Sequence, residues 1–405
     1  MVGLLSHHDA ESIGAALGAV RDGIARQPGG MPSRILVADT GSADGAAART
    51  RALLADAADL IEVAPRAPVP LLERPYHGVP AKARAVQALL ARARQLDARA
   101  CVVIDAAVAR VSPRSVGMLA DPVLAHGVDV VSPYYDRHRY EGALTKGLVR
   151  PLVRALYGVR LHQPAAQELA CSRRAIEWLL DDDIWDREGA QAGIDVWLAT
   201  SVASGDFRLA EAPLGVRRLP VRGEEAPDLP TTLSQVVGAL FADIEARVDV
   251  WQRRRGSSAV PLLGQPAAAT PAPDVAVDPG QLIESYRLGY RELRDLWNWV
   301  LPPRTIVELG RLVSLPSAQF RLDDTVWAHV VYDFALGHRL RVMPRDHLLR
   351  SLVPLYLGWL ASFVLQVQAL DAAGVEERLD RLGAAFEAEK PYLIARWRWP
   401  ERLRT

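Results

Sequence analysis

The chain has 405 residues, enough for two or three domains of ordinary size and for a large hydrophobic core. Half of the residues are hydrophobic and 24% are charged, which is typical of a folded globular protein and excludes a disordered chain. The 48 basic and 48 acidic side chains cancel, so no net positive field draws the protein to DNA or RNA. We therefore expect no nucleic-acid partner.

Three features bear on the compartment in which the protein works. Its two cysteines, Cys101 and Cys171, are far apart in sequence and make neither a disulfide framework nor a zinc site, which favours a reducing compartment. The first residues, MVGLLSHHDAES, lack the basic and long apolar parts of a signal peptide. The uncharged stretch 352–370 has the length of a membrane span, but it contains Pro354 and Gln366 and lies among amphipathic helices. We interpret it as a buried bundle helix and expect a cytoplasmic protein with no membrane partner.

The first 220 residues alternate short apolar runs with helical patterns, which predicts a mostly parallel sheet flanked by helices. In chain order, we expect a strand over 1–5, a helix over 11–26, a strand over 34–38, a helix over 46–58, a strand over 60–63, a helix over 81–96 and strands over 100–104 and 128–132. This order of elements is typical of the α/β class.

The pattern of apolar and polar residues changes after residue 232. The pattern predicts an α/β domain over 1–232, a connecting helix over 233–255, a Pro/Ala-rich linker over 256–280 and an α-helical domain over 281–405. Within the last domain we expect helices over 281–300, 303–313, 322–341, 345–370 and 373–395. Seven of the ten tryptophans follow residue 233, and their helical spacing predicts core packing.

Polar residues follow three of the expected strands. Ser6 opens the loop after the first strand, Asp39 begins the turn after the second, and Asp105 follows the apolar run ACVVI. Ligands of open parallel sheets bind at the carboxyl ends of the strands, and ionised carboxylates accept hydrogen bonds from ribose hydroxyls. Taken alone, each aspartate is typical of a helix cap. Polar residues at the ends of all three strands together favour a nucleotide-binding site. Neither G-x-G-x-x-G after the first strand nor a P-loop is present.

At its N-terminal end the chain resembles the GT-A glycosyltransferases. The turn after the second strand reads Asp39-Thr-Gly-Ser-Ala-Asp-Gly45, similar to the D-x-G-S-x-D-G of these enzymes. Pro80-Ala-Lys82 lies where they carry Gly-Lys-Gly, and Asp105-Ala-Ala107 lies at their Asp-x-Asp motif.

Further motifs narrow the resemblance to the retaining glucosyl-3-phosphoglycerate and mannosylglycerate synthases. Residues 142–152 are similar to the G-x-x-T-x-x-x-x-R-P-L of the first group, and 163–168 to the Q-P-L-G-G-E of both. Residues 193–195 match their G-I-D or G-V-E, and 214–217 match the run before their metal-binding histidine. The order and spacing hold over about residues 1–255.

This resemblance implies a GT-A domain followed by a helical domain, and retaining transfer of a hexose to a small hydroxy acid such as glycerate. The donor would be GDP-mannose, UDP-glucose or GDP-glucose. The helical domain would form the interface of a homodimer. The implied donor-binding residues are Ser6, Glu11, Asp39, Lys82, Asp105, Arg217 and Arg218. The implied catalytic residues are Asp195 and Glu168, and the implied acceptor-binding residues are Arg137, Thr145, Ala166 and Gln167.

The chain departs from the family pattern at the metal. The second aspartate of Asp-x-Asp, which would hold Mg²⁺ or Mn²⁺, is Ala107, and no histidine follows Arg217-Arg218. Alanine offers a metal no donor atom, so we expect no protein ligand for it at this position. Two alternatives stay open. Arg217 or Arg218 supplies the missing positive charge to the diphosphate, or the chain is a catalytically inactive nucleotide-binding or scaffold protein.

Smaller departures concern the acceptor and the lysine motif. The arginine that follows the glycine of G-x-x-T in the phosphoglycerate enzymes is Ala143, which favours glycerate or another acceptor over phosphoglycerate. The glycines of Gly-Lys-Gly are Ala81 and Ala83, and those of G-G-E are Ala166 and Gln167. Side chains at these positions narrow the space beside the backbone.

Overall fold

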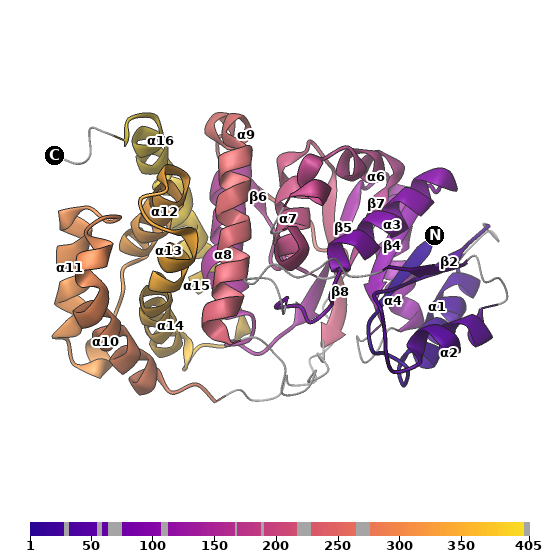
Figure 1. Ribbon diagram of the computed structural model, residues 1–405, viewed down its shortest axis with the longest axis horizontal. Coiled ribbons are helices and arrows are strands. Elements are labelled where there is room, and N and C mark those ends of the chain that lie inside the picture. The colour runs from indigo at the N-terminus through magenta and orange to yellow at the C-terminus, as the bar shows by residue number, and fades with distance from the viewer. Residues whose placement is uncertain are drawn as a thin grey trace. The chain divides into compact units, whose positions relative to one another are not determined.

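The computed structural model divides into two compact units, each made of three chain segments (Figure 1). It describes residues 1–27, 32–54, 59–63, 75–106, 112–166, 168–187, 190–216, 228–264 and 276–400. The first unit comprises 1–137, 162–227 and 260–272, and the second comprises 138–161, 228–259 and 273–405. The predicted domain boundaries stay a prediction. They do not anticipate that 138–161 belongs to the second unit and 260–272 to the first.

A seven-stranded sheet organises the first unit. In spatial order its strands are β3 (Leu60–Glu62), β2 (Ile35–Asp39), β1 (Val2–Ser6), β4 (Ala100–Asp105), β7 (Leu169–Ser172), β5 (Val130–Asp136) and β8 (Leu209–Val216). All neighbours are parallel except β7, which runs antiparallel to both β4 and β5. The predicted α/β class with a mostly parallel sheet is confirmed, and each of the five expected strands begins within two residues of its predicted start.

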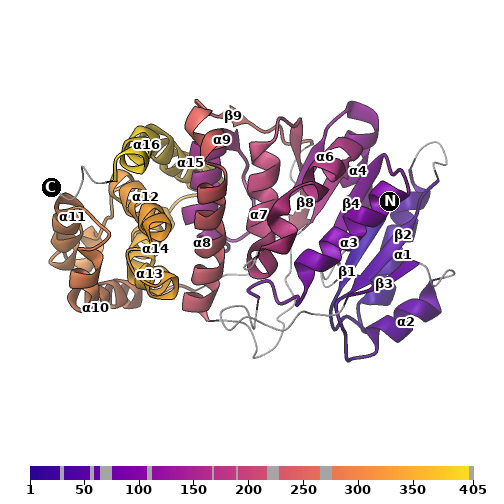
Figure 2. The same cartoon turned by 45° about the horizontal axis from the view of Figure 1, so that its top comes forward.

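Helices cover both faces of this sheet, which explains why its central strands are apolar throughout. On β4, Val102 and Ile104 join the core formed with α1 (Ile13–Ala25) and α4 (Pro113–His126). Cys101 and Val103 point to the opposite core. That core is formed with α3 (Lys82–Gln95), α6 (Arg173–Leu180) and α7 (Ala190–Ser204), which pack against one another (Figure 2). Two shorter helices complete the unit, α2 (Ala46–Leu53) and η5 (Asp183–Asp186).

The second unit is helical, as the sequence predicts. Its long helices are α8 (Leu229–Ala246), α10 (Pro279–Trp297), α11 (Pro303–Val313), α12 (Asp324–Leu340), α14 (Val353–Val367) and α15 (Ala372–Ala388). Its shorter helices are η3 (Thr145–Val149), α5 (Arg150–Leu152), η4 (Val153–Tyr157), α9 (Val248–Arg253), η6 (Ser317–Gln319), α13 (Arg345–Ser351) and α16 (Lys390–Arg398). β6 (Val159–Arg160) and β9 (Ser258–Ala259) form a two-stranded sheet.

Three predicted helices of this unit are divided in the structure. The one predicted over 233–255 forms α8 and α9, which meet at Arg247. The helix predicted over 345–370 ends at Ser351, and α14 begins at Val353 with Pro354 in its first turn. The helix predicted over 373–395 is likewise divided into α15 and α16, and Pro391 lies in the first turn of α16. Proline has no N–H to donate within a helix, so the latter two single-helix predictions are wrong at the proline.

The apolar stretch around α14 forms part of the helical core. Within the described residues, Arg345–Val367 is the segment long and apolar enough to cross a membrane, and 67% of its apolar window is buried. Helices α10 and α14 pack so closely that a Cβ at Gly289 would lie 2.2 Å from Pro354, and one at Gly358 would lie 2.5 Å from the ring of Tyr286. Burial of this kind is typical of the core helix of a bundle.

Tryptophan packing is confirmed for most of the second unit. The side chains of Trp251, Trp297, Trp327, Trp359 and Trp397 are buried. The prediction is wrong for Trp299 and Trp399, which are 75% and 58% exposed because they follow the last residues of α10 and α16.

The two cysteines are neighbours despite 69 intervening residues. Antiparallel pairing of β4 with β7 places Cys101 directly opposite Cys171, and both thiols are free and fully buried. Their distance in sequence gives no sign of this pairing, and the two thiols form no disulfide. Burial raises the pKa of Cys101 to about 12. Burial, with the neighbouring Cys101, raises the pKa of Cys171 well above its usual range.

Because thiolate is the reactive form, neither cysteine should react with a thiol reagent such as iodoacetamide while the protein is folded. We expect less than ~5% labelling at pH 8 in buffer and labelling of both thiols in concentrated urea, counted by intact mass. Reduced protein that labels rapidly without denaturant would contradict the buried pairing of the two strands.

Candidate active site

The carboxyl ends of the central strands carry the predicted donor residues side by side. In the pairing of β1 with β2, Ser6 lies opposite Asp39, and in the pairing of β1 with β4, Leu5 lies opposite Asp105. All three predicted residues are buried, with Asp39 and Asp105 only 2% and 4% exposed. The Oγ of Ser6 has no hydrogen-bond partner among the described residues. The order of the strands thus brings these residues to one edge of the sheet.

The reversed strand β7 adds Glu168 to the same edge. Val103 of β4 pairs with Leu169, the first residue of β7. Because β7 starts where β4 ends, Glu168 lies beside the end of β4 that carries Asp105. Glu168 is 2% exposed, and both of its carboxylate oxygens are buried. A residue predicted to be catalytic therefore lies among the predicted donor residues.

Asp39 organises its own turn. Its Oδ1 accepts hydrogen bonds from the backbone N–H groups of Gly41 (3.0 Å) and Ser42 (2.9 Å), and its Oδ2 accepts one from the Ser42 hydroxyl (2.6 Å). These three bonds satisfy the charge of a buried carboxylate. The side chain thus has a local structural role, whatever ligand its free lone pairs accept.

The loops after β1 and β2 are fastened to each other. The N–H of His8 donates to the Ser42 hydroxyl (3.0 Å), and the N–H of Ala10 donates to the Asp44 carboxylate (2.8 Å), which also caps α2 at Ala46 (3.0 Å). Partial burial opposes ionisation of Asp44. The two backbone hydrogen bonds and nearby His8 nevertheless hold its pKa below the usual range. Glu11 follows this network and is exposed.

A buried ion pair joins α3 to α7. The Lys82 Nζ lies 2.7 Å from the Asp195 Oδ1, and the two side chains are 0% and 1% exposed. The Tyr76 hydroxyl donates to the other Asp195 oxygen (3.3 Å). The attraction between the two charges compensates for part of the hydration that each loses on burial. The Asp195 carboxylate also offsets the repulsion between the Lys82 cation and the positive N-terminal end of the α3 dipole. Two predicted site residues are therefore in direct contact, while their contact with a ligand stays a prediction.

Backbone strain lies next to this pair. Ala81 precedes α3 in the left-handed conformation, with φ +54°. This conformation is unfavourable for alanine and favourable for glycine, which the similar enzymes carry there. Ala83, at the other glycine position, is an ordinary buried helical residue.

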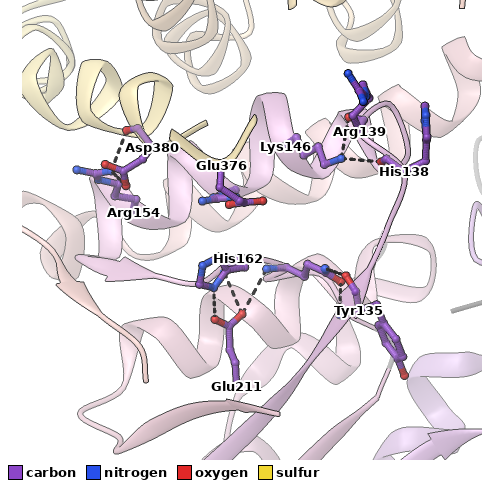
Figure 3. Close-up of polar contacts among 11 residues, drawn as sticks. Tyr135, His138, Arg139, Lys146, Arg154, His162, Glu211, Glu376 and Asp380 are labelled. Carbon is purple, nitrogen blue, oxygen red and sulfur yellow. Dashed lines mark hydrogen bonds and ion pairs between the residues drawn. The ribbon is translucent and has the colours of Figure 1, made fainter. Parts of the chain in front are cut away.

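The loop before Glu168 is held by two side chains that the predicted site does not include. Glu211 of β8 accepts from the backbone N–H groups of His162 (2.9 Å) and Gln163 (3.4 Å), and it contacts the His162 Nδ1 (2.5 Å). The Gln163 amide donates to the Tyr135 carbonyl (2.6 Å) and accepts from the Tyr135 N–H (3.3 Å) (Figure 3). A single carboxylate within the small and apolar run LAEAPL was the available signal for Glu211.

The predicted acceptor residues lie in different parts of the chain. Arg137 directly follows β5, and its guanidinium lies 6.0 Å from the centre of the Tyr135 ring. Ala166 is 8% exposed and lies in the loop before β7. Thr145 belongs to the second unit, where it begins η3. In the same motif, Arg150 pairs with Glu376 of α15 (2.7 Å).

Several predicted positions lie outside the described residues, namely Ala107, Gln167, Arg217 and Arg218. The predicted metal position and the predicted arginine substitutes for the metal stay predictions for this reason. In the part of the chain that the structure describes, no group of three His, Cys, Asp or Glu side chains has the arrangement of a metal site.

Comparison with solved structures finds enzymes of the type that the motifs resemble. Glucosyl-3-phosphoglycerate synthase from Mycobacterium tuberculosis, in complex with Mn²⁺, UDP and glucosyl-3-phosphoglycerate, matches at a TM-score of 0.42 and 22% identity, over 60% of this chain and 78% of that chain. Mannosyl-3-phosphoglycerate synthase from Rubrobacter xylanophilus matches at 0.41 and 20%, over 63% and 76%. The chain is thus similar in structure to sugar-phosphoglycerate synthases.

Other comparisons find no match. No protein-family model matches the chain, and no curated protein matches it. The structural similarity is distant, so the residues and their geometry carry the functional argument.

The buried ion pair predicts a specific stability pattern. Lys82→Met should destabilise the protein by ~3–5 kcal/mol, because it leaves the Asp195 charge buried without its partner. Asp195→Asn should destabilise it for the converse reason. The double variant should be more stable than the sum of the two single losses implies, as measured by urea unfolding. Losses that simply add would argue against the pair.

The strain at Ala81 predicts that two neighbouring Ala→Gly changes have different effects. Ala81→Gly should leave stability unchanged or raise it by up to ~1 kcal/mol, because glycine accepts a positive φ. Ala83→Gly should lower it by ~1 kcal/mol, because it lies inside the helix. Thermal unfolding of both variants measures the difference, and equal losses would be inconsistent with the left-handed conformation at residue 81.

Proposed function

We propose that the protein is a glycosyltransferase that moves a hexose from a nucleoside-diphosphate sugar to a small hydroxy acid, with retention at the anomeric carbon. The observation that carries the proposal is the single sheet edge at which Ser6, Asp39, Asp105 and Glu168 meet. These residues come from motifs that stand in the same order in retaining GT-A enzymes. The matched M. tuberculosis enzyme has a crystal structure in complex with UDP-glucose and phosphoglyceric acid, which are a nucleoside-diphosphate sugar and a small hydroxy acid with a phosphate.

The donor half of the proposal rests on the strand ends. Asp105 lies near the middle of the edge, where its carboxylate would accept hydrogen bonds from ribose hydroxyls. The fastened loops after β1 and β2 would hold the base. Asp39 would act mainly by shaping that loop, because its oxygens already accept three hydrogen bonds.

In the transfer step, the bond from the anomeric carbon to the diphosphate breaks, a bond to the acceptor hydroxyl oxygen forms on the same face, and the hydroxyl proton passes to the departing diphosphate. Negative charge grows on the leaving diphosphate, so a cation must face it. Arg217 or Arg218 would supply that charge as a guanidinium. The anomeric centre becomes oxocarbenium-like, and the Asp195 carboxylate would stabilise it electrostatically, with Glu168 as a second carboxylate at the site.

The acceptor half of the proposal names a small carboxylate such as glycerate. Arg137 and the backbone around Ala166 and Gln167 would bind it. Ala143 stands where the similar phosphoglycerate enzymes have an arginine, which favours an acceptor without a phosphate.

A specific observation favours a second candidate function, an inactive glycosyltransferase-like binding protein. Lys82 and Asp195 neutralise each other and are almost fully buried, so neither charge faces solvent in this structure. A protein of this kind would bind a nucleotide through the strand ends and transfer nothing. Turnover separates the two candidates, because both would bind nucleotide.

The first test is nucleoside-diphosphate release from UDP-glucose and from GDP-mannose, each with glycerate and with either EDTA or Mg²⁺. We expect release in EDTA. Ala107 offers a metal no donor atom, and Arg217 or Arg218 would supply the positive charge in its place. Asp195→Asn should lower kcat by roughly 100-fold or more while nucleotide binding stays within about twofold.

Other outcomes of this assay would change the proposal. Release that needs Mg²⁺ would show that unassigned residues hold a metal. No release from folded wild-type protein that binds UDP or GDP would favour the inactive binding protein. Full activity of Asp195→Asn would remove that residue from the reaction.

A further inference from the structure

We propose that Glu211 is a positioning residue that governs acceptor binding by holding the loop 162–168, and that it acts independently of donor binding. The inference rests on the proposed glycosyltransferase function, because it names how that site is shaped. Glu211 is fully buried, and all three hydrogen-bond contacts described for its side chain go to the start of this loop.

Glu211 is itself fixed by a sheet. Within β8 it lies opposite Ser132 of β5. On its other side, its N–H donates to the Pro261 carbonyl (2.9 Å), and its carbonyl accepts from the Leu263 N–H (2.7 Å). A carboxylate on a backbone that is paired on both sides has little freedom to move. It therefore provides a rigid attachment point for the loop.

The contacts of Glu211 match the donors that the loop offers. One oxygen accepts from two consecutive backbone N–H groups, those of His162 and Gln163, and the other meets the His162 ring at Nδ1. These donors satisfy a carboxylate that is out of contact with water. Removing the carboxylate would leave the two N–H groups without this partner, so the chain at 162–163 would have to rearrange.

Gln163 makes a second attachment, to β5. Its side-chain amide bonds both polar groups of the Tyr135 backbone, as a neighbouring strand would (Figure 3). The loop is thereby fixed at 163, and it is fixed again at Leu169, where β7 enters the sheet. Only residues 164–168 lie between these points, so Ala166 and Glu168 have few available conformations.

The donor side of the edge has a separate set of contacts. The loops after β1 and β2 are held by Asp39, Asp44 and Ser42, and within the described part of the chain none of the hydrogen bonds of these three side chains reaches the loop 162–168. The two sets of contacts involve different residues and different strands. Loosening one should therefore leave the ligand of the other bound normally.

The experiment compares Glu211→Ala with Asp44→Ala, which removes one exposed carboxylate from the contacts of the donor side. We expect Glu211→Ala to raise the KM for glycerate by roughly 10- to 100-fold and to leave the KM for the sugar nucleotide within about twofold. Asp44→Ala should have the reverse pattern. Proportional changes in both KM values for Glu211→Ala, or none in either, would overturn the proposal.

Conservative variants separate positioning from general loss of structure. In His162→Asn the side-chain amide nitrogen replaces Nδ1 as a donor to Glu211, so it should retain most of the affinity for glycerate that His162→Ala loses. Gln163→Ala should reproduce the effect of Glu211→Ala, because it releases the same loop. An equal defect in His162→Asn and His162→Ala would contradict a role for the Glu211 contact.

Hydrogen exchange distinguishes failure of this inference from failure of the proposed function. In folded Glu211→Ala, the amides of His162 and Gln163, which lose their acceptor, should exchange at least tenfold faster, while those of the β1 and β2 loops keep the wild-type rate. Unchanged exchange at 162 and 163 would overturn the inference even in an active enzyme. Wild-type protein that transfers no sugar would remove the proposed function, and exchange alone would then decide whether Glu211 anchors the loop.

Discussion

The direction of one short strand determines where the candidate site residues lie. β7 enters a parallel sheet from the opposite side, so its first residue lies at the edge where its neighbours end. A parallel strand at this position would place Glu168 at the far edge, away from Asp105. The helices that follow or precede the strands obey the same geometry. α3 leads into β4 and α7 leads into β8, so Lys82 and Asp195, near the starts of these helices, lie toward the same edge.

Much of the polar chemistry in this region serves to hold loops. Asp39 and Asp44 stabilise the turns after β1 and β2, and Glu211 and Gln163 stabilise the approach to β7. Buried carboxylates need several donors each, and backbone N–H groups of loops need acceptors, so the two requirements satisfy each other. A sheet edge built in this way is preorganised, which favours binding without a large conformational change.

The sequence predicts this molecule best where periodicity and strand ends are clear. Apolar runs place β1, β2 and β4, and the order of those strands then brings Ser6, Asp39 and Asp105 together. The pattern predicts no strand over 169–172, although the strand found there is longer than β3, which is predicted. Long-range pairs such as Lys82 with Asp195, or Glu211 with His162, depend on helix and sheet packing that no local pattern encodes. The motif resemblance marked Lys82 and Asp195 as site residues without showing that they touch.

The interleaving of the two units has a consequence for how the chain is made. The edge of β8 is completed by residues 261–263, which pair with Glu211 only after the long helix α8 and the short helix α9 have been synthesised. The first unit therefore gains these backbone contacts of β8 only after part of the second unit has been synthesised. A fragment cut at residue 232 would lack both hydrogen bonds that 261–263 make with Glu211.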